Sequence, residues 1–378
     1  MDHYSRIGMD TSKHVYQLHG VDPSERPVLR RKLRRSALLP FFKGIAPTTI
    51  GIEACAGSHH LARELEALGH TVKLMAPQLV KPYVKRGKND AADAEALCEA
   101  MSRPTMRFVP IKTPDQQAGL MLVGMRDALI RHRTQMSNAI RGYAAEFGLV
   151  AATGLDKIEP LLDRIAGELS LPTLARELFA LHAKAYGALH QQIQEIDAKL
   201  MVWFKQNAVA RRLAKIPGVG PIGASLLVMK TPDPGVFRCG RDYAAWIGLT
   251  PRDHSTAGKT RTGVITRAGD EALRSTLVVG ATAVVTQVRR RREAPSKGQK
   301  EAPPPQAAVA GAGVPTPRET WLIQLLKRKS PKLVAVALAN KTARIAWTMM
   351  VTGSTYDARH KRTIAPTSTR DAGLPEAA

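Results

Sequence analysis

The sequence is short of several features that would place a protein in a common class. Its 378 residues include only three cysteines, Cys55, Cys98 and Cys239, and these lack metal-ligand spacing. Three cysteines are too few for a disulfide framework, which indicates a reducing compartment. No apolar run reaches the roughly 18 residues of a membrane span, and the polar start MDHYSRIGMD is unlike a signal peptide. We therefore expect a cytoplasmic protein with no membrane partner.

Acidic and aromatic residues are also scarce. The chain has 32 Asp and Glu against 56 Lys and Arg, a net charge of +24, and only 5% of its residues are aromatic. Few aromatic rings leave few platforms on which single-stranded bases stack. The hydrophobic fraction of 44% is enough for folded cores. A folded protein with this charge is expected to bind a polyanion.

The pattern of apolar residues changes along the chain from sheet-like to helical. Residues 6–20 and 48–54 read as strands and residues 59–70 as a helix, an alternation typical of an α/β sheet. Residues 114–215 place apolar residues at helical spacing. We expect the basic run LRRKLRRS at residues 29–36 to be a solvated loop or helix. A seam that suits a coiled coil or helical hairpin comprises Leu181, Ala185, Leu189, Ile193, Ile196 and Leu200.

Four carboxylates stand where a sheet and a helix can bring them together. Asp10 and Glu53 follow strand-like runs, and Asp90 and Asp93 lie at the start of a helical stretch, with Asn89 or Asp90 as its N-cap. Singly, each fits an ordinary surface or capping carboxylate. Together they favour a site for Mg²⁺ or Mn²⁺, because a hard cation offsets carboxylate repulsion. Two such ions about 3.5–4 Å apart promote phosphodiester cleavage.

Three segments carry these acids: IGMDTSKH at residues 7–14, GIEACAG at residues 51–57 and KNDAADAEAL at residues 88–97. In order and context they resemble the three acidic motifs of the DEDD transposases of insertion-sequence family one-ten. The resemblance implies a RuvC-like domain with the ribonuclease H fold and two metal ions in its site. Its catalytic and metal-binding residues would be Asp10, Glu53, Asp90 and Asp93.

A Gly-rich turn, IPGVGP at residues 216–221, has the composition of a helix-hairpin-helix. Its glycines allow a tight turn that presents backbone N–H groups to a phosphate. Gly218 and Gly220 are therefore candidate nucleic-acid contacts. A plain tight connection between two helices explains the same pattern.

Residues 244–277 resemble the second conserved block of the same family, in which Gly-Leu-x-Pro-Arg precedes a serine-containing loop. Composition alone indicates a basic loop against a DNA backbone. The resemblance implies instead that a serine is the nucleophile and becomes joined to a DNA end. Ser255 is the only serine of this loop, and Thr256 is the alternate because an ungapped comparison places the family's serine there.

Basic residues supply the candidate contacts to phosphate, since guanidinium binds phosphate in a bidentate way. Those of the second half are Arg252, Lys259, Arg261, Arg267 and Arg274. Lys85 and Arg86 precede the third acidic motif. Further candidates for backbone contact are Arg30, Arg31, Arg34, Arg35, Arg131 and Arg133.

The expected fold is α/β plus all-α: an N-terminal ribonuclease H-like mixed sheet with helices, a long helical or coiled-coil middle, and a mostly helical C-terminal domain with a helix-hairpin-helix. The expected divisions are a RuvC-like catalytic domain at residues 1–145, a helical linker suited to dimerisation at 146–205, a helix-hairpin-helix and serine-loop domain at 206–288, a flexible Pro/Ala/Arg-rich insertion at 289–318, C-terminal helices at 319–360 and a disordered tail at 361–378.

The resemblance implies a transposase, a DNA recombinase of a mobile insertion sequence, that works through a covalent seryl-DNA intermediate. Its partners would be donor and target DNA, a bridge RNA that pairs with both, and further copies of the chain, from dimer to tetramer. It would associate with the bacterial nucleoid during the reaction. Two alternatives remain from the residues: a structure-selective endonuclease of the Holliday-junction resolvase type without a covalent intermediate, and an inactive nucleic-acid-binding remnant.

Overall fold

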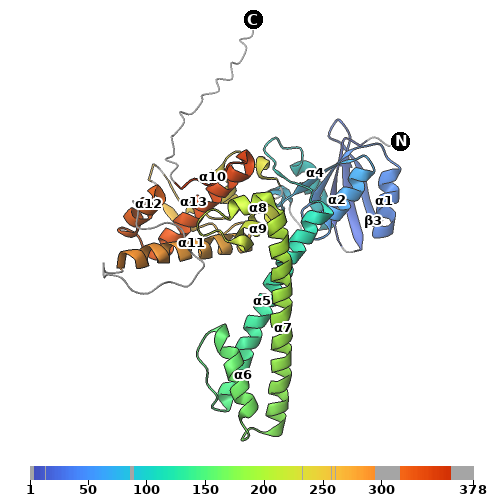
Figure 1. Cartoon of the computed structure of the whole chain (residues 1–378). Coiled ribbons are helices and arrows are strands. Elements are labelled where there is room, and N and C mark those ends of the chain that lie inside the picture. The colour runs from blue at the N-terminus through green and yellow to red at the C-terminus, as the bar shows by residue number, and fades with distance from the viewer. Residues whose placement is uncertain are drawn as a thin grey trace. The chain divides into compact units, whose positions relative to one another are not determined.

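The computed structural model describes residues 4–12, 14–85, 89–231, 233–256, 258–259, 261–293 and 316–358. The chain divides into two compact units, Met1–Gly119 and Leu120–Ala378, which are described separately (Figure 1). Most of the expected 289–318 insertion and the whole 361–378 tail lie outside the described residues. The finer domain boundaries expected from the sequence stay predictions.

The first unit is built on a mixed sheet in the order β3-β2-β1-β4-β5-β6. Its strands are β1 (Arg6–Thr11), β2 (Val15–Val21), β3 (Pro27–Arg34), β4 (Thr49–Glu53), β5 (Thr71–Met75) and β6 (Phe108–Val109). Strands β3, β2 and β1 are antiparallel neighbours, β1, β4 and β5 are parallel, and β6 is antiparallel to β5. The central strands β1 and β4 therefore end at the same edge of the sheet.

Helices cover both faces of this sheet. One face packs against α1 (Arg35–Lys43) and α2 (Ser58–Ala67), with Ile7, Ile52 and Phe42 in a shared core. The other face packs against α4 (Asp90–Ala100), whose Leu97 and Cys98 are buried with Met75. Between β5 and α4 lie the short helices α3 (Pro77–Val80) and η1 (Lys81–Tyr83).

The basic run at residues 29–36 was expected to be a loop or helix, and that prediction is wrong. Residues up to Arg34 form the edge strand β3, and α1 begins at Arg35. Leu29 and Leu33 are buried and pair with Gly20 and Tyr16 of β2. Leucines four residues apart lie on one side of a strand as well as of a helix, so the pairing with β2 decides the conformation.

The second unit begins with a long helical hairpin. Helices α5 (Pro114–Glu146) and α7 (Thr173–Gln206) lie side by side, with η2 (Leu155–Lys157) and α6 (Ile158–Gly167) between them in the chain (Figure 1). Leu129 of α5 packs on Ile193 and Ile196 of α7. Near this contact Arg126 Nε donates to Asp197 Oδ1 over 2.5 Å. The predicted helical seam therefore closes within the chain at these positions.

At the other end of the hairpin the seam differs from the prediction. Leu181 is 64% exposed, so it does not belong to the buried seam. Phe179 and Tyr186 are buried there instead, packed with Ile140 of α5 and Leu161 of α6. Apolar residues spaced three and four apart fit two adjacent faces of α7. Contact with α6 buries one of these faces.

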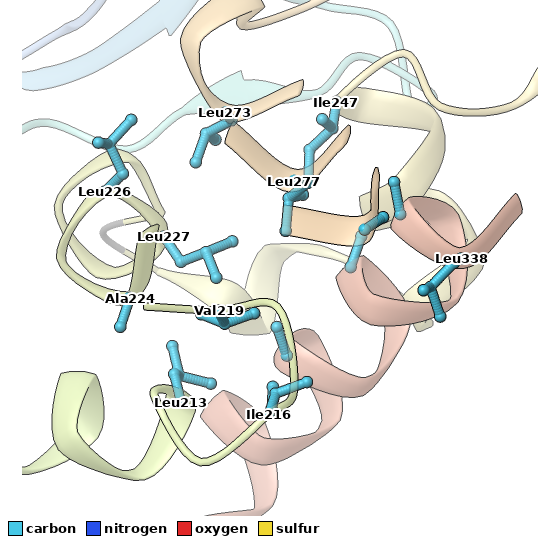
Figure 2. Close-up of a cluster of buried hydrophobic side chains, with 14 of the residues drawn as sticks. Leu213, Ile216, Val219, Ala224, Leu226, Leu227, Ile247, Leu273, Leu277 and Leu338 are labelled. Atoms are coloured by element: carbon cyan, nitrogen blue, oxygen red, sulfur yellow. The ribbon is translucent and has the colours of Figure 1, made fainter. Parts of the chain in front are cut away.

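The remainder of the second unit is mostly helical. Its elements are α8 (Ala208–Leu213), α9 (Pro221–Lys230), η3 (Pro234–Val236), α10 (Gly240–Trp246), β7 (Pro251–Asp253), β8 (Thr262–Ile265), α11 (Glu271–Glu293), α12 (Pro317–Leu326) and α13 (Pro331–Thr352). Leu213, Val219, Leu227, Leu277 and Leu338 converge in its core (Figure 2). No helix of the described residues is long and apolar enough to cross a membrane. The predicted fold class, a mixed sheet followed by a mostly helical remainder, is confirmed.

Candidate active site

Two of the four predicted carboxylates lie at the ends of neighbouring parallel strands. Strands β1 and β4 pair in parallel with Met9 opposite Ile52, so the next step of the same register sets Asp10 beside Glu53. Side chains alternate between the two faces of a strand. Asp10 therefore points to the same face as Gly8, and Glu53 to the same face as Gly51.

Those two glycines explain why the other two carboxylates come close. A Cβ at Gly8 would lie 2.5 Å from the backbone N of Cys98 and closer still to the carbonyl O of Ala94, both in α4. A Cβ at Gly51 would lie 2.8 Å from Cε of Met101, just beyond the end of α4. At Gly8 only glycine permits this approach of helix to sheet, because the atoms it meets belong to the backbone of α4. At Gly51 the atoms it meets are the ends of flexible methionine side chains, which can move.

The start of α4 is fixed by a cap. Asn89 Oδ1 accepts a hydrogen bond from the backbone N of Ala92 over 2.8 Å, which confirms Asn89 as the N-cap among the two predicted alternatives. Asp90 and Asp93 thus occupy the first helical turn, where carboxylates are also stabilised by the helix dipole. We call Asp10, Glu53, Asp90 and Asp93 the acid cluster.

The carboxylates of the acid cluster act on one another electrostatically. Burial raises the pKa of Asp10 to about 6, with further increases from the charges of Asp90 and Asp93 and a smaller one from Glu53, against a backbone hydrogen bond at Thr11. Burial also raises the pKa of Glu53, with the charge of Asp93 acting in the same direction. Asp10 and Glu53 resist ionisation mainly because they are buried, and the charges of nearby carboxylates add to the effect. A bound cation would remove this cost.

The chemistry of the acid cluster suits a hard divalent cation, since all of its side-chain donors are carboxylate oxygens. Within the part of the chain that the structure describes, no three His, Cys, Asp or Glu side chains are close enough, as placed, to share one ion. The donors therefore fit the cation in type, and their present spacing is wider than that of a filled site.

Lys85 lies beside α4, and its ammonium pairs with Glu95 over 2.5 Å. The buried His19 is a neighbour of this pair: burial lowers its pKa, Glu95 opposes the shift, and Arg30 and Lys85 add to it. Arg86, the other candidate contact before α4, lies outside the described residues.

The serine loop is the tip of a small hairpin formed by β7 and β8. Ser255 Oγ accepts a hydrogen bond from the backbone N of Arg261 over 3.0 Å, and the Ser255 N–H donates to Asp253 Oδ1 over 2.9 Å. A side-chain hydrogen bond with Ser255 is the largest cause that lowers the pKa of Asp253. Thr256 instead forms an isolated backbone bridge with Lys259.

The basic candidates of the second unit fall into two groups. Arg252, Lys259, Arg261 and Arg267 are exposed around the hairpin. Arg274 is half-buried and donates to the carbonyl oxygens of Ile247 and Ala268 over 3.1 and 3.2 Å. Arg274 therefore ties the two ends of the β7–β8 segment to α11.

The predicted helix-hairpin-helix turn lies between α8 and α9. Gly218 has φ +86°, and a Cβ there would lie 2.7 Å from the carbonyl O of Gly280 in α11. Glycine is required at this position because the backbone of the turn packs directly on the backbone of α11. Gly220 is exposed, with open space where a Cβ would stand. A phosphate contact at either glycine stays a prediction.

Comparisons with known proteins bear on both units. A family model for IS110 DEDD transposases matches residues 7–147, and one described as the transposase IS116/IS110/IS902 family matches residues 210–296. A Sinorhizobium fredii protein, named as transposase y4pF/y4sB, is 63% identical over 93% of this chain and 85% of its own length. The chain belongs to the IS116/IS110/IS902 family of transposases.

Other members of this transposase family match over nearly the full length. A Pseudomonas aeruginosa protein, named as a family 20 transposase, is 41% identical over 93% of this chain and 98% of its own length. The transposase for insertion sequence element IS1328 of Yersinia enterocolitica is 38% identical over 94% of this chain and 99% of its own length. As a transposase the protein is an enzyme with DNA as substrate, and its DEDD domain indicates a general dependence on divalent metal.

Sequence reasoning missed three residues that shape the sites of this transposase. Gly8 and Gly51 each precede a carboxylate by two residues, which places glycine and acid on one face of a strand. That spacing was visible in both motifs. Asp253, which holds Ser255, carried no comparable signal, because an Asp two residues before a Ser is common in turns.

Proposed function

We propose that this transposase cuts and rejoins DNA strands in a metal-dependent reaction that uses both the acid cluster and Ser255. The observation that carries the proposal is that Asp10 and Glu53 lie at the ends of the neighbouring strands β1 and β4, where Asp90 and Asp93 in the first turn of α4 act on the pKa of Asp10 after burial, its largest cause. Asp10, Glu53, Asp90 and Asp93 would hold Mg²⁺ or Mn²⁺, two ions per site. When bound, the metal supplies Lewis-acid stabilisation of the phosphate oxygens.

Ser255 is the proposed nucleophile. Its attack forms a bond between Oγ and phosphorus and breaks the bond from phosphorus to one sugar oxygen. That oxygen leaves as a hydroxyl, and the proton it gains balances the proton that the serine loses. The hydrogen bond that Ser255 Oγ accepts from the backbone N of Arg261 supports Ser255 over Thr256, because it holds the Ser255 hydroxyl in place.

Arg252, Lys259, Arg261 and Arg267 support the same proposal. All four are exposed on or beside the β7–β8 hairpin, and guanidinium groups bind phosphate oxygens in pairs. Their role is to hold the phosphate that Ser255 attacks. We further propose that a bridge RNA directs the reaction to donor and target DNA, and that the working form is a dimer to tetramer in which one subunit's acid cluster serves another's Ser255.

Trapping of a covalent adduct tests the nucleophile. Purified protein is incubated with end-labelled DNA of the element's terminus, its co-purified RNA and Mg²⁺, and then denatured. Wild type and Thr256→Ala are expected to leave label attached to protein, whereas Ser255→Ala leaves none. An adduct that survives in Ser255→Ala and disappears in Thr256→Ala would transfer the role to Thr256. Metal-dependent cleavage by wild type with no adduct would indicate a plain endonuclease.

The RNA partner is tested by what co-purifies. We expect sequencing of nucleic acid bound to the purified protein to recover one defined RNA encoded beside its reading frame. Asp90→Ala should retain that RNA while losing strand cleavage, because the RNA is expected to bind exposed basic side chains and not the acid cluster. Only RNA of random sequence in the wild-type preparation would contradict guidance by RNA.

A further inference from the structure

Strand β3 carries basic side chains on the same face of the sheet as the acid cluster. Asp10 pairs with Gln17 of β2, and Gln17 pairs with Lys32 of β3. Residues directly opposite one another in paired strands point to the same face. Lys32 therefore lies in one cross-strand row with Asp10, two strands away, a separation of about 10 Å.

The same register places two more cations on this face. Arg30 pairs with His19, which pairs with Gly8, and Arg34 pairs with Val15. We call Arg30, Lys32 and Arg34 the β3 track. Alternate residues of a strand are about 6.6 Å apart, which is close to the spacing of successive phosphates in an extended nucleic-acid strand. The three cations are therefore evenly spaced along the sheet edge, and Lys32 is the one that lies in the same row as Asp10.

The charges of the β3 track are open to solvent. Arg30, Lys32 and Arg34 are all exposed. Among the residues that the structure describes, none of the three has an ion-pair partner, whereas Arg6 pairs with Glu25 and Lys85 pairs with Glu95. Glu95, whose pKa is lowered chiefly by its hydrogen bond to Lys85 and further by the charge of Arg30, compensates part of the charge of Arg30. A row of three exposed cations still suits a polyanionic ligand.

Arg31 provides a contrast within the same strand. It pairs with Leu18, so it points to the opposite face, and its guanidinium lies over the ring of Phe41 at 5.4 Å. Edge strands often carry charges that oppose pairing with another sheet, and Arg31 would serve that purpose as well as its neighbours. Edge protection does not explain why three cations share the face of the acid cluster.

We propose that the β3 track binds the phosphate backbone of the DNA strand that the acid cluster cuts, within a few nucleotides of the cleaved bond. This inference rests on the proposed function. Electrostatic complementarity and the shared row with Asp10 identify the occupant as the cut strand, because a backbone held by Lys32 lies at the level of the site. The contacts fix the position of the strand and leave its base sequence unread.

The salt dependence of DNA binding tests this proposal. Full-length protein in EDTA is titrated with a fluorescent DNA duplex of the element's terminus at several salt concentrations. Each phosphate contact contributes about 0.9 to the slope of log Kobs against log salt. We expect Arg30→Gln, Lys32→Gln and Arg34→Gln each to reduce the slope by about 0.9, and the triple variant by two to three. The matched control Arg31→Gln should keep the wild-type slope.

A steady-state cleavage assay with Mg²⁺ gives the second readout. The triple variant should need a higher DNA concentration to reach half of its maximal rate, with the maximal rate close to wild type, because the acid cluster is intact. Equal slopes for the triple variant and Arg31→Gln would overturn the proposal. The proposal would also be overturned if the triple variant kept the wild-type DNA slope but lost the co-purified RNA, because the β3 track would then bind RNA.

The result separates this proposal from the proposed function. Wild type that cleaves DNA with Mg²⁺ but shows no effect of the track variants refutes the track alone. Wild type that neither binds nor cleaves DNA refutes the proposed function, and the track with it.

Discussion

At the scale of single residues, Asp10 opposes the stability of the unit that carries it. Its carboxyl has a pKa of about 6 because of burial and the charges of Asp90 and Asp93, against an ordinary value of about 3.9. A raised carboxyl pKa means that the folded state holds its proton more tightly than the unfolded chain. Stability therefore falls as pH rises from about 4 to about 6, and it stays lower above that window.

The substitution Asp10→Asn should consequently stabilise the metal-free protein. Asp10 is half-exposed, so solvent screening reduces the effect to about 1 kcal/mol, which corresponds to a rise in Tm of about 4 °C for a unit of this size. Thermal melts in EDTA at pH 7 measure it, and the gain should vanish below pH 4. Asp22→Asn is the control. The pKa of Asp22 is lowered, chiefly by a backbone hydrogen bond from Arg26, so the folded state favours its negative charge, and removal of that charge should reduce Tm. A lower Tm for Asp10→Asn would contradict the account.

Divalent metal should reverse the order of Tm between wild type and Asp10→Asn. A ligand that binds only the folded state stabilises it by RT ln(1 + [L]/Kd), about 1.4 kcal/mol at ten times Kd. We expect Mg²⁺ to raise the Tm of wild type and to leave that of Asp10→Asn nearly unchanged. The melts are repeated with Mg²⁺ in place of EDTA. Equal Mg²⁺ responses in the two proteins would remove Asp10 from the metal site.

At the scale of elements, the contact between α4 and the sheet places the acid cluster. Gly8 lets the backbone of α4 lie directly on β1. A methyl group there meets the carbonyl O of Ala94 and the N of Cys98, which are backbone atoms and cannot rotate away. The first turn of α4 would have to move, and Asp90 and Asp93 with it.

The substitution Gly8→Ala should therefore abolish cleavage while all four carboxylates remain. Overpacking of this kind costs about 1–3 kcal/mol, so Tm should fall by several degrees without loss of the fold. Gly44→Ala is the matched control, because its Cβ would meet only ordinary contacts, the nearest at 3.5 Å. Circular dichroism and strand cleavage measure the two effects. Wild-type cleavage by Gly8→Ala would show that the position of α4 does not matter.

The elements also show how far sequence reasoning reaches. The strands that carry Asp10 and Glu53 at or near their ends, and the cap at Asn89, followed from local patterns. The edge strand β3 did not, because Leu29 and Leu33 fit either a helix or a strand and their partners in β2 are remote in the sequence. The burial of Phe179 in place of Leu181 depended on α6 in the same way. Local spacing defines candidate faces, and packing partners select among them.

The candidate site was predictable in part for the same reason. Its acids were found because each stands at an end of a periodic segment. The fact that Gly8 lets the helix lie directly on the sheet depends on distances between segments far apart in sequence. Likewise, the division of the basic residues of β3 between two faces follows only from the register with β2.

At the scale of the whole molecule, a net charge of +24 accompanies a site made of four acids. In the proposed reaction the positive charge favours contact with nucleic acid, and the acid cluster would act only once cations neutralise it. Phosphate neutralisation releases counterions, so affinity for DNA and RNA should fall steeply as salt increases.

The proposed exchange of sites between subunits makes a prediction at this scale. Asp90→Asn and Ser255→Ala proteins should each be inactive alone. If one subunit's acid cluster serves another's Ser255, mixed assemblies restore intact sites, at about a quarter of the wild-type number for random pairing. Cleavage after the two proteins are mixed and reassembled measures this. No recovery from mixtures that demonstrably exchange subunits would place acid cluster and serine of each site in one chain.

The most direct test of the central claim, that the acid cluster and Ser255 act in one reaction, is the metal dependence of the covalent adduct. Wild type and Asp90→Asn are incubated with end-labelled DNA of the element's terminus, with Mg²⁺ or with EDTA, and resolved on denaturing gels. The account predicts an adduct with cut DNA for wild type in Mg²⁺, and none in EDTA or with Asp90→Asn. An adduct of equal yield in Asp90→Asn, or in EDTA, would contradict it.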